Sequence, residues 1–322
     1  MAILITGGAG FIGSKINQYL IKKFDHILIL DNLSRGKREN IEDQNNQAKF
    51  TFVNNDVSDF RSTFNIIKRY NNKNPITHVW HLAANSDIPA GISNSKVDLK
   101  DTFMTTYVVL EIMKILEIKN LFFSSSSAIY GDHGSDITLN ENIGPLLPIS
   151  NYGAMKLASE AIISAAAESF LDKVWIFRFP NVIGAPATHG VILDFINKLK
   201  KTPYQLNVLG NGTQQKAYLH IDELIEGMFF IYENSVEKIN LYNIGPEDEG
   251  CLISDIAKIV VDRINPRANI IFGKEVRGWI GDVPKFRYSI EKVKKLGWEP
   301  KLSSIDAVKR AVNEIAIQEG FN

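Results

Sequence analysis

The first half of the chain alternates short apolar runs with longer segments of helical periodicity. In the longer segments, apolar residues recur three and four positions apart, as on one face of a helix. Because strand–helix–strand alternation builds βαβ units, this pattern predicts a parallel sheet with helices on both faces. The predicted strands are Ala2–Thr6, Ile27–Asp31, Phe50–Asn54, Val79–Ala83, Asn120–Ser124 and Val174–Phe179. The predicted helices are Gly13–Lys23, Phe60–Tyr70, Asp101–Leu116 and Tyr152–Phe170.

The pattern changes after Phe179, where prolines and glycines interrupt it. Helices such as Asp222–Glu233 and Ile253–Arg263 alternate there with short strands. We therefore expect an α/β fold with a Rossmann-type, doubly wound parallel sheet in residues 1–179. A smaller, interwoven α/β domain would occupy mainly residues 180–322, and a segment at about 215–235 would return to the first domain.

Composition excludes several classes of protein. The 36 Lys and Arg residues balance the 36 Asp and Glu residues, and zero net charge argues against broad binding to nucleic acid or anionic membranes. The one cysteine, Cys251, cannot form an internal disulfide or complete a thiolate metal cage. The histidines have no metal-ligand spacing, so no metal is expected. Neither a signal peptide nor a membrane span is evident, and we expect a cytoplasmic enzyme.

A glycine-rich turn follows the first predicted strand and precedes a helix. Gly7, Gly10 and Gly13 form G-x-x-G-x-x-G, in which glycine permits a tight turn, close approach of the backbone to a pyrophosphate, and close helix packing. A purely structural turn is the alternative for the glycines alone. The next predicted strand ends at Asp31, where a carboxylate can hydrogen-bond an adenosine ribose. Its charge repels a 2′-phosphate and so favours NAD over NADP, although Arg35 nearby could serve such a phosphate.

Tyr152 and Lys156 lie four residues apart, hence on one face of a predicted helix. A free tyrosine has a pKa of about 10 and is a poor base at neutral pH. A lysine one turn away, together with the positive charge of bound nicotinamide, favours the phenolate and lowers that pKa. The pair can then accept a proton from an alcohol. The same spacing arises by chance in many helices, but here it follows a dinucleotide-type turn.

Four serines, residues 124–127, begin at the end of the fifth predicted strand. In a parallel sheet, ligands gather at the carboxyl ends of strands. A hydroxyl there can hydrogen-bond the reacting alcohol or the oxygen on which charge develops. A polar strand exit with turn-forming serines is the alternative, and we prefer it for Ser127.

Together these motifs resemble the extended short-chain dehydrogenase/reductases and, within them, the nucleotide-sugar epimerases and dehydratases. The resemblance covers essentially the whole chain. Its further marks are HLAA at 81–84, RFPNVIG at 178–184, GNGTQ at 210–214, YNIG at 242–245 and GWEP at 297–300. It implies NAD as cofactor and a small nucleotide sugar as substrate, bound mainly by the second domain. It also implies a homodimer that forms a four-helix interface through the helices Asp101–Leu116 and Tyr152–Phe170.

The resemblance also implies roles for individual residues. The catalytic residues would be Ser126, Tyr152 and Lys156. The NAD-binding residues would be Gly7, Gly10, Phe11, Ile12, Gly13, Asp31, Asn32, Ser34, Gly36, Asp56, Val57, Leu82, Ala83, Ala84, Ser124, Tyr152, Lys156, Pro180 and Val182. The substrate-binding residues would be Ser86, Ser126, Asn181, His189, Val191, Lys216, Arg277 and Asp282.

The chain departs from the family pattern at two places that concern the substrate diphosphate. Lys216 stands where the family usually has arginine, and a lysine meets a phosphate as a point charge without a bidentate fork. The segment from Arg277 to Asp282 is two residues longer than the usual R-x-G-D motif. Within it, Trp279 either stacks on the base or sugar or packs a lid.

The expected reaction class follows from two further positions. Dehydratases of the family carry an acid pair in a D-E-x-Y-G motif, and here those positions hold Ser127 and Ala128. Elimination across C5–C6 then has no evident acid, and reversible hydride exchange at C4 remains. We expect a 4-epimerase that interconverts sugars of the UDP-glucose and UDP-galactose type. The alternatives are a modifier of a GDP-, CDP- or dTDP-linked deoxy sugar or heptose, a 4,6-dehydratase, and a non-catalytic NAD-binding scaffold.

Overall fold

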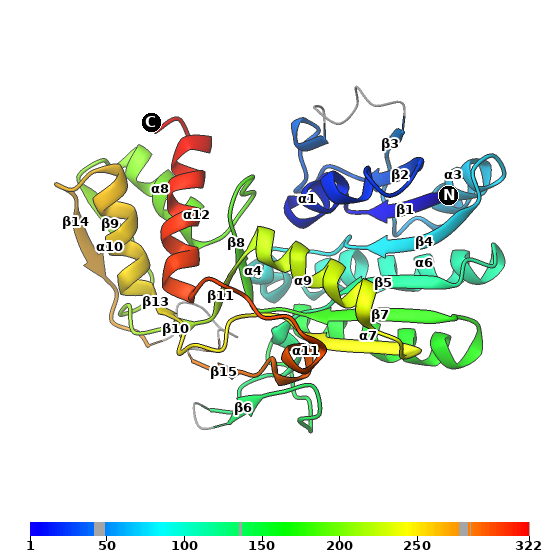
Figure 1. Cartoon of the computed structure of the whole chain (residues 1–322). Coiled ribbons are helices and arrows are strands. Elements are labelled where there is room, and N and C mark those ends of the chain that lie inside the picture. Colours follow the sequence, from blue (N-terminus) through cyan, green and yellow to red (C-terminus); the bar gives the residue numbers. More distant parts are fainter. Residues whose placement is uncertain (42–48, 135–136, 277–282, 284, 322) are drawn as a thin grey trace. The chain divides into compact units, whose positions relative to one another are not determined.

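The computed structural model describes residues 1–41, 49–134, 137–276, 283 and 285–321. Their contacts divide the chain into two compact units (Figure 1). Unit 1 comprises Met1–Ile129, Ser150–Arg178 and Ser235–Tyr242, and unit 2 comprises Tyr130–Ile149, Phe179–Asn234 and Asn243–Asn322. By these contacts the segment Tyr130–Ile149 groups with unit 2, and Ser235–Tyr242 groups with unit 1.

Unit 1 is built on a seven-stranded sheet with the strand order β12–β7–β5–β4–β1–β2–β3. The strands are β1 (Ala2–Thr6), β2 (His26–Asp31), β3 (Phe50–Asn54), β4 (Ile76–His81), β5 (Asn120–Ser124), β7 (Lys173–Arg178) and β12 (Ile239–Asn243). All pairings from β3 across to β7 are parallel. The chain grows outward from β1 in both directions, which confirms the predicted doubly wound Rossmann-type sheet. The fourth strand is Ile76–His81 rather than Val79–Ala83.

The helices of unit 1 follow the predicted alternation, with one interruption. They are α1 (Phe11–Leu20), α3 (Phe60–Asn71), α4 (Ile88–Ser93), α5 (Ser95–Asp98), α6 (Thr105–Ile115) and α7 (Asn151–Ser169). A π-helical turn, Leu99–Met104, joins α5 to α6, so the predicted helix Asp101–Leu116 does not run unbroken. A 3-10 turn, Ser127–Ile129, follows β5. The start of α7 is fixed by Ser150, whose hydroxyl accepts a hydrogen bond from the Gly153 amide (3.1 Å).

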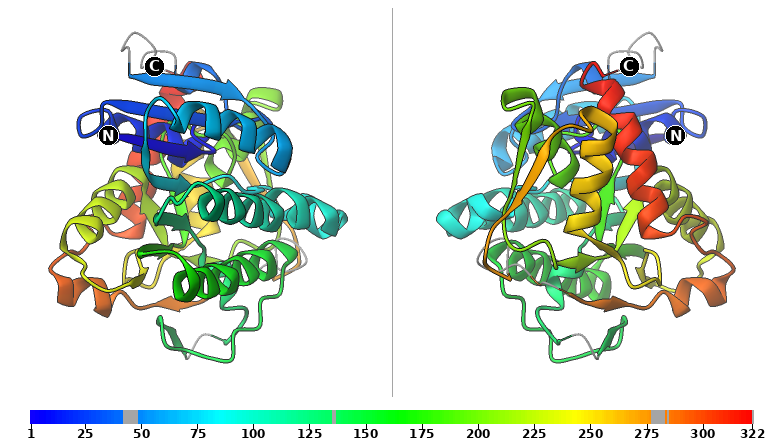
Figure 2. Two further views of the ribbon diagram at one scale, coloured as in Figure 1. Left: turned by 90° about the vertical axis from the view of Figure 1, so that its right-hand side faces the viewer. Right: turned by 90° about the vertical axis from the view of Figure 1, so that its left-hand side faces the viewer.

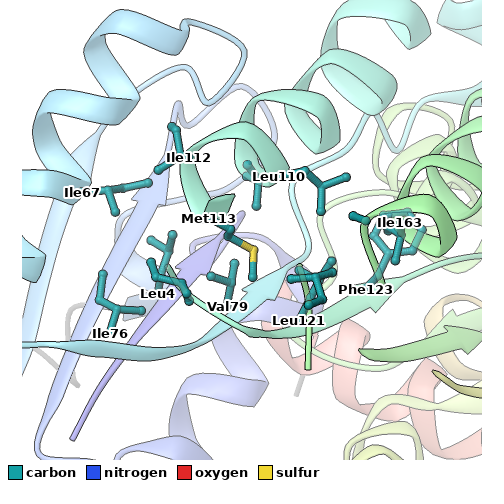
Figure 3. Close-up of a cluster of buried hydrophobic side chains, with 14 of the residues drawn as sticks. Leu4, Ile67, Ile76, Val79, Leu110, Ile112, Met113, Leu121, Phe123 and Ile163 are labelled. Atoms are coloured by element: carbon teal, nitrogen blue, oxygen red, sulfur yellow. The ribbon is translucent and has the colours of Figure 1, made fainter. Parts of the chain in front are cut away.

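Both faces of the unit 1 sheet are buried. One face packs aliphatic residues against α3, α6 and α7, including Leu4, Val79 and Leu121 on the strands and Met113 and Ile163 on the helices (Figure 3). Neighbouring strand residues point the other way, because side chains alternate along a strand. On that second face the rings of Trp80, Phe122 and Trp175 stack, with centroids 3.9 and 4.2 Å apart.

Unit 2 has a smaller core, formed mainly by α8 (Val191–Lys201), α10 (Ile253–Ile264) and α12 (Ser304–Gln318). Its other helices are α9 (Ile221–Asn234) and α11 (Glu291–Leu296). Its strands form pairs rather than a large sheet: β8 (Asn181–Ile183) with β11 (Tyr218–His220), β9 (Gln205–Val208) with β14 (Asn269–Phe272), β10 (Gln215–Lys216) with β13 (Cys251–Leu252), and β6 (Thr138–Leu139) with β15 (Arg287–Tyr288). Among the described helices of the two units, none has the length and apolar character needed to span a membrane.

Candidate active site

The glycine turn connects β1 to α1 and leaves no room for side chains on its inner side. Gly7 has φ +72°, which favours glycine, and a Cβ there would lie 2.7 Å from the Ala83 amide nitrogen. A Cβ on Gly13 would lie 2.3 Å from the Gly7 carbonyl oxygen. Gly10 precedes α1 and caps it with no side chain. The first amides of α1 are therefore positioned to bind the anionic pyrophosphate of a dinucleotide.

Asp31, at the end of β2, holds the glycine turn as well as carrying a negative charge. Its Oδ2 accepts the Ala9 amide (3.0 Å), and its Oδ1 accepts the Leu33 amide (2.8 Å). Burial raises the pKa of the Asp31 carboxyl, and hydrogen bonds from the backbone of Leu33, Ala9 and Gly10 oppose that rise. A carboxylate has about four lone-pair sites and the three amides occupy three of them, so one remains to accept a hydroxyl of an adenosine ribose.

The loop after β2 lies against the glycine turn. A Cβ on Gly36 would come within 2.8 Å of the Ala9 carbonyl carbon, so this close approach requires glycine. Asn32 and Ser34 are exposed, and the Asn32 side chain accepts the Ser34 amide (3.0 Å). Arg35, the residue that could serve a 2′-phosphate, forms an ion pair with Asp87. That pairing supports the prediction of NAD.

Asp56 and Val57 follow shortly after β3, the outermost strand of the sheet on the side of β2. The Asp56 carboxylate accepts the Lys100 ammonium (2.6 Å) and the hydroxyl of Ser58 (2.7 Å). Burial raises the Asp56 pKa, but these hydrogen bonds outweigh it, and the net pKa is lowered. Asp56 is therefore ionised at neutral pH, beside the buried Val57.

The residues after β4 continue the same edge of the sheet. The Leu82 amide donates to the Thr6 carbonyl (3.1 Å), and the Thr105 hydroxyl contacts the Ala83 carbonyl (3.4 Å). Buried His81 bridges the hydroxyls of Thr6 (2.7 Å) and Thr106 (3.0 Å). Burial, with a smaller contribution from the Lys156 charge, lowers the His81 pKa to about 3. His81 is thus neutral and fixes β4 to α6. Ala84 and Ser86 follow on this segment and are partly buried.

The three predicted catalytic residues lie together in unit 1. Tyr152 and Ser126 share a side-chain hydrogen bond, and the Lys156 ammonium donates to the Ser124 carbonyl (2.6 Å). Burial raises the pKa of Tyr152 to about 12; the hydrogen bond to Ser126 lowers it, and the charge of Asp98 raises it further. Burial lowers the Lys156 pKa to about 7, against the charges of Glu160 and Asp98.

The remaining predicted residues lie in unit 2. Asn181 and Val182 belong to β8, directly after Pro180, and the Asn181 amide group donates to the Ala217 carbonyl (3.3 Å). Lys216 lies in β10 opposite Cys251. His189 contacts the Thr188 hydroxyl (3.0 Å), and Val191 is the first residue of α8. Arg277, Trp279 and Asp282 lie outside the described residues. The roles of all these side chains toward a substrate stay predictions.

Two buried carboxylates beside the predicted catalytic residues were not identified from the sequence. Glu160 binds Arg178 and Ser125, and it follows Lys156 by one helical turn, a spacing that could have revealed it. Asp98 is fully buried, and its Oδ1 accepts the Asn85 side chain (2.8 Å). Its Oδ2 has no hydrogen-bond partner among the described residues and would lie 1.7 Å from a Cβ on Gly91.

One cluster of metal-type ligands occurs among the described residues, in unit 2. It consists of His220, Asp222 and Glu314. Arg310 forms ion pairs with both carboxylates, and Glu314 also accepts the His220 ring nitrogen (3.0 Å). Because a guanidinium already neutralises these acids, we interpret the cluster as a structural ion-pair network.

Comparison with known proteins extends this picture. The model of the NAD dependent epimerase/dehydratase family matches residues 3–245. A putative UDP-glucose 4-epimerase of Methanocaldococcus jannaschii is 30% identical over 97% of this chain and 97% of its own length. A UDP-glucuronic acid decarboxylase of Arabidopsis thaliana is 26% identical over 98% of this chain and 69% of its own length.

Solved structures of similar proteins have the same fold. The UDP-glucose 4-epimerase of Thermotoga maritima, solved with UDP-glucose, is 27% identical and superposes with a TM-score of 0.85 over 99% of this chain and all of its own. The UDP-glucose 4-epimerase of Thermus thermophilus, in complex with NAD, gives 25% identity and a TM-score of 0.83 over 98% of both chains.

These matches agree with the glycine turn, the acidic residue at the end of β2 and the Tyr152–Lys156 pair, and NAD is the cofactor that these residues fit. The relatives catalyse more than one reaction, so the matches define the class of substrate more firmly than the reaction. The chain belongs to the NAD-dependent epimerase/dehydratase family and is an enzyme that acts on nucleotide sugars.

Proposed function

We propose that the protein is a cytoplasmic nucleotide-sugar 4-epimerase that interconverts UDP-glucose and UDP-galactose type sugars through a 4-keto intermediate. The observation that carries the proposal is the turn after β5. It presents Ser126 to Tyr152 but carries Ser127 and Ala128 where dehydratases have an acid pair. Asp98, the carboxylate whose charge acts on Tyr152, is fully buried in α5 and out of reach of a substrate.

In this proposal Tyr152 transfers the proton, and the neighbouring residues stabilise its phenolate form. Tyr152 accepts the proton of the sugar 4′-hydroxyl, and Ser126 donates a hydrogen bond that stabilises the phenolate. The Lys156 ammonium lies 5.8 Å from the centre of the Tyr152 ring and, like bound nicotinamide, supplies a positive charge that favours the phenolate, whereas burial raises the Tyr152 pKa. When bound, NAD supplies reversible hydride acceptance at C4. Tyr152 returns the proton after the ketose has presented its other face.

The substrate would be held through its diphosphate, with Lys216 and Arg277 as cationic ligands and Asn181 as a polar one. Ser86, His189, Val191 and Asp282 would contact the sugar or base, and Pro180 and Val182 would flank the nicotinamide. These assignments follow from the family resemblance. A diphosphate held this way leaves the hexose free to rotate, which 4-epimerisation requires.

The direct test is incubation of the purified protein with UDP-galactose and NAD, with chromatographic separation of the C4 epimers. Formation of UDP-glucose supports the proposal. A lack of epimer on UDP-, GDP-, CDP- and dTDP-hexoses alike would overturn it. A thermal-shift panel with the same four bases distinguishes UDP from the alternatives. Release of a 4-keto-6-deoxy sugar would instead identify a 4,6-dehydratase.

We also propose a homodimer that forms a four-helix interface through α6 and α7. The two helices lie side by side on one face of unit 1 (Figure 2). Tyr107 and Ile115 of α6 are 45% and 53% exposed, two turns apart on one face. Ala161 and Ala165 of α7 are also exposed and small enough for close helix approach. Light scattering should give twice the chain mass, and Ile115→Lys should give monomers.

A further inference from the structure

Helix α7 presents three functional groups to the end of β5, each one turn apart. Tyr152, Lys156 and Glu160 lie at i, i+4 and i+8, hence on one face. Each binds one of three consecutive serines. Ser126 hydrogen-bonds Tyr152, the Ser124 carbonyl accepts the Lys156 ammonium (2.6 Å), and the Ser125 hydroxyl donates to Glu160 Oε1 (2.5 Å). The first two positions are explained by the proposed proton transfer, and the third is not.

Glu160 is held more firmly than the other two residues. Arg178, at the end of β7, donates from Nε to Glu160 Oε1 (3.0 Å) and from Nη2 to Oε2 (2.6 Å). The Arg178 and Glu160 side chains are only 5% and 8% exposed. A buried ion pair is weak evidence for stability, because desolvation offsets much of the attraction. Its position beside Lys156 therefore calls for a functional explanation.

The charged and titratable groups near Lys156 come from several elements. Tyr152 and Glu160 lie on α7 itself, His81 on β4, Asp98 on α5, and Arg178 behind Glu160 on β7. The Phe123 ring of β5 faces the ammonium at 4.7 Å. Because His81 is neutral, the acids Glu160 and Asp98 are the groups that favour the charged lysine. Burial lowers the Lys156 pKa to about 7, so its charge at neutral pH depends on them, and on Glu160 more than Asp98.

We propose that Glu160, clamped by Arg178 and Ser125, is a positioning residue that keeps Lys156 protonated and aligned beside Tyr152. This inference rests on the proposed function, in which a charged Lys156 assists proton transfer at Tyr152. Loss of the Glu160 charge makes Lys156 neutral at lower pH, and Tyr152 then loses the nearby cation that favours its phenolate.

The test compares the wild-type protein with Glu160→Gln, which keeps the shape and removes the charge. Lys156 is titrated by NMR of its ¹³Cε group in the protein without substrate, and the signal is assigned by its loss in Lys156→Met. We expect the midpoint to fall by about one pH unit, the scale on which a nearby opposite charge acts. The alkaline limb of the kcat profile should move the same way, with the KM for the sugar nucleotide unchanged. Glu160→Asp, which retains the charge, should have a Lys156 midpoint and an alkaline limb of the kcat profile close to those of the wild-type protein.

If Glu160→Gln does not fold, the double variant Glu160→Gln/Arg178→Met also removes the unpaired guanidinium. The midpoint should still move downward, but by less, because the Arg178 charge that disfavours protonated Lys156 is lost as well. An unchanged Lys156 midpoint in a folded variant overturns the inference. The NMR titration needs no turnover, so a shifted midpoint in a protein without epimerase activity would refute the proposed function and leave the charge effect of Glu160 standing.

Discussion

Most of the residues assigned to the cofactor rest on a different framework from most of those assigned to the substrate. In unit 1, most of the cofactor residues lie at or after the ends of β1, β2, β3, β4 and β5, whose carboxyl ends form one edge of a parallel sheet, and Tyr152 and Lys156 lie on α7. In unit 2, Asn181 and Lys216 lie on strands of only three and two residues. A large sheet fixes the positions of its strand ends, whereas short strand pairs allow insertions and substitutions. The fold therefore preserves NAD chemistry while the sugar contacts can diverge.

The largest expected effect concerns the proton-transfer residue of the rigid framework. Tyr152→Phe keeps the ring and removes the hydroxyl, and we expect kcat to fall roughly 10³-fold, within the range for general acid–base groups. NAD affinity measured by calorimetry should stay within about threefold. A variant with full activity would show that another group transfers the proton, and a non-catalytic NAD scaffold would show no activity to lose.

A Cβ at Gly13 should disturb the same framework through packing. Because that atom would meet the Gly7 carbonyl oxygen at 2.3 Å, Gly13→Ala should destabilise unit 1 by roughly 1–3 kcal/mol and weaken NAD binding. Differential scanning calorimetry checks the stability. Gly144→Ala is the matched control, since no atom lies within 4 Å of a Cβ there. Equal melting temperatures for both variants would contradict the tight turn.

Asp31 should contribute to affinity and to choice of cofactor. Asp31→Ala removes the acceptor for the ribose and for two backbone amides, and each hydrogen bond to a charged group is worth about 1.5–3 kcal/mol. We expect NAD to bind at least tenfold more weakly and the preference over NADP to shrink. Arg35→Ala, which removes only the partner of Asp87, should leave NAD affinity nearly unchanged. Retention of full NAD preference in Asp31→Ala would refute the role.

The smallest effect is expected in unit 2. Lys216→Ala should raise the KM for the nucleotide sugar roughly tenfold, because an interaction with a charged group contributes about 1.5 kcal/mol or more. NAD affinity should not change. Lys216→Arg should keep the KM at or below the wild-type value, because arginine can bind the phosphate through a bidentate fork. Lys201→Ala, in the last turn of α8, is the control and should leave the KM unchanged. An unaltered KM in Lys216→Ala would remove this residue from the proposed substrate site.

The same contrast explains what could be predicted from the sequence. Strands β1, β3 and β5 have the predicted bounds. For β1 and β5 the reason is that continuous apolar runs between turn residues mark buried parallel strands, whereas β3 lies at the sheet edge and has no fully buried residue. The fourth strand was predicted three residues late, since Thr77 and His78 interrupt its apolar run and Leu82–Ala84 extend it into the loop.

Other features depend on contacts that no local pattern encodes. The π-helical turn at Leu99–Met104 aligns Thr102, Thr105 and Thr106 with the end of β4, and helical periodicity does not reveal it. The addition of β12 to the sheet beside β7 joins residues far apart in the chain. The ion pair between Glu160 and Arg178 is not evident from the sequence, because the burial of both side chains becomes visible only in the folded structure.

The aromatic stack on the unit 1 sheet also has a practical consequence. Trp80 and Trp175 flank Phe122 and are 1% and 2% exposed, and the chain has only four tryptophans. An indole in apolar surroundings emits at shorter wavelength than one in water. Replacement of Trp279 and Trp298 by phenylalanine would leave these two as the emitters. The tryptophan emission would then report unfolding of the unit 1 sheet alone, separately from any change in unit 2.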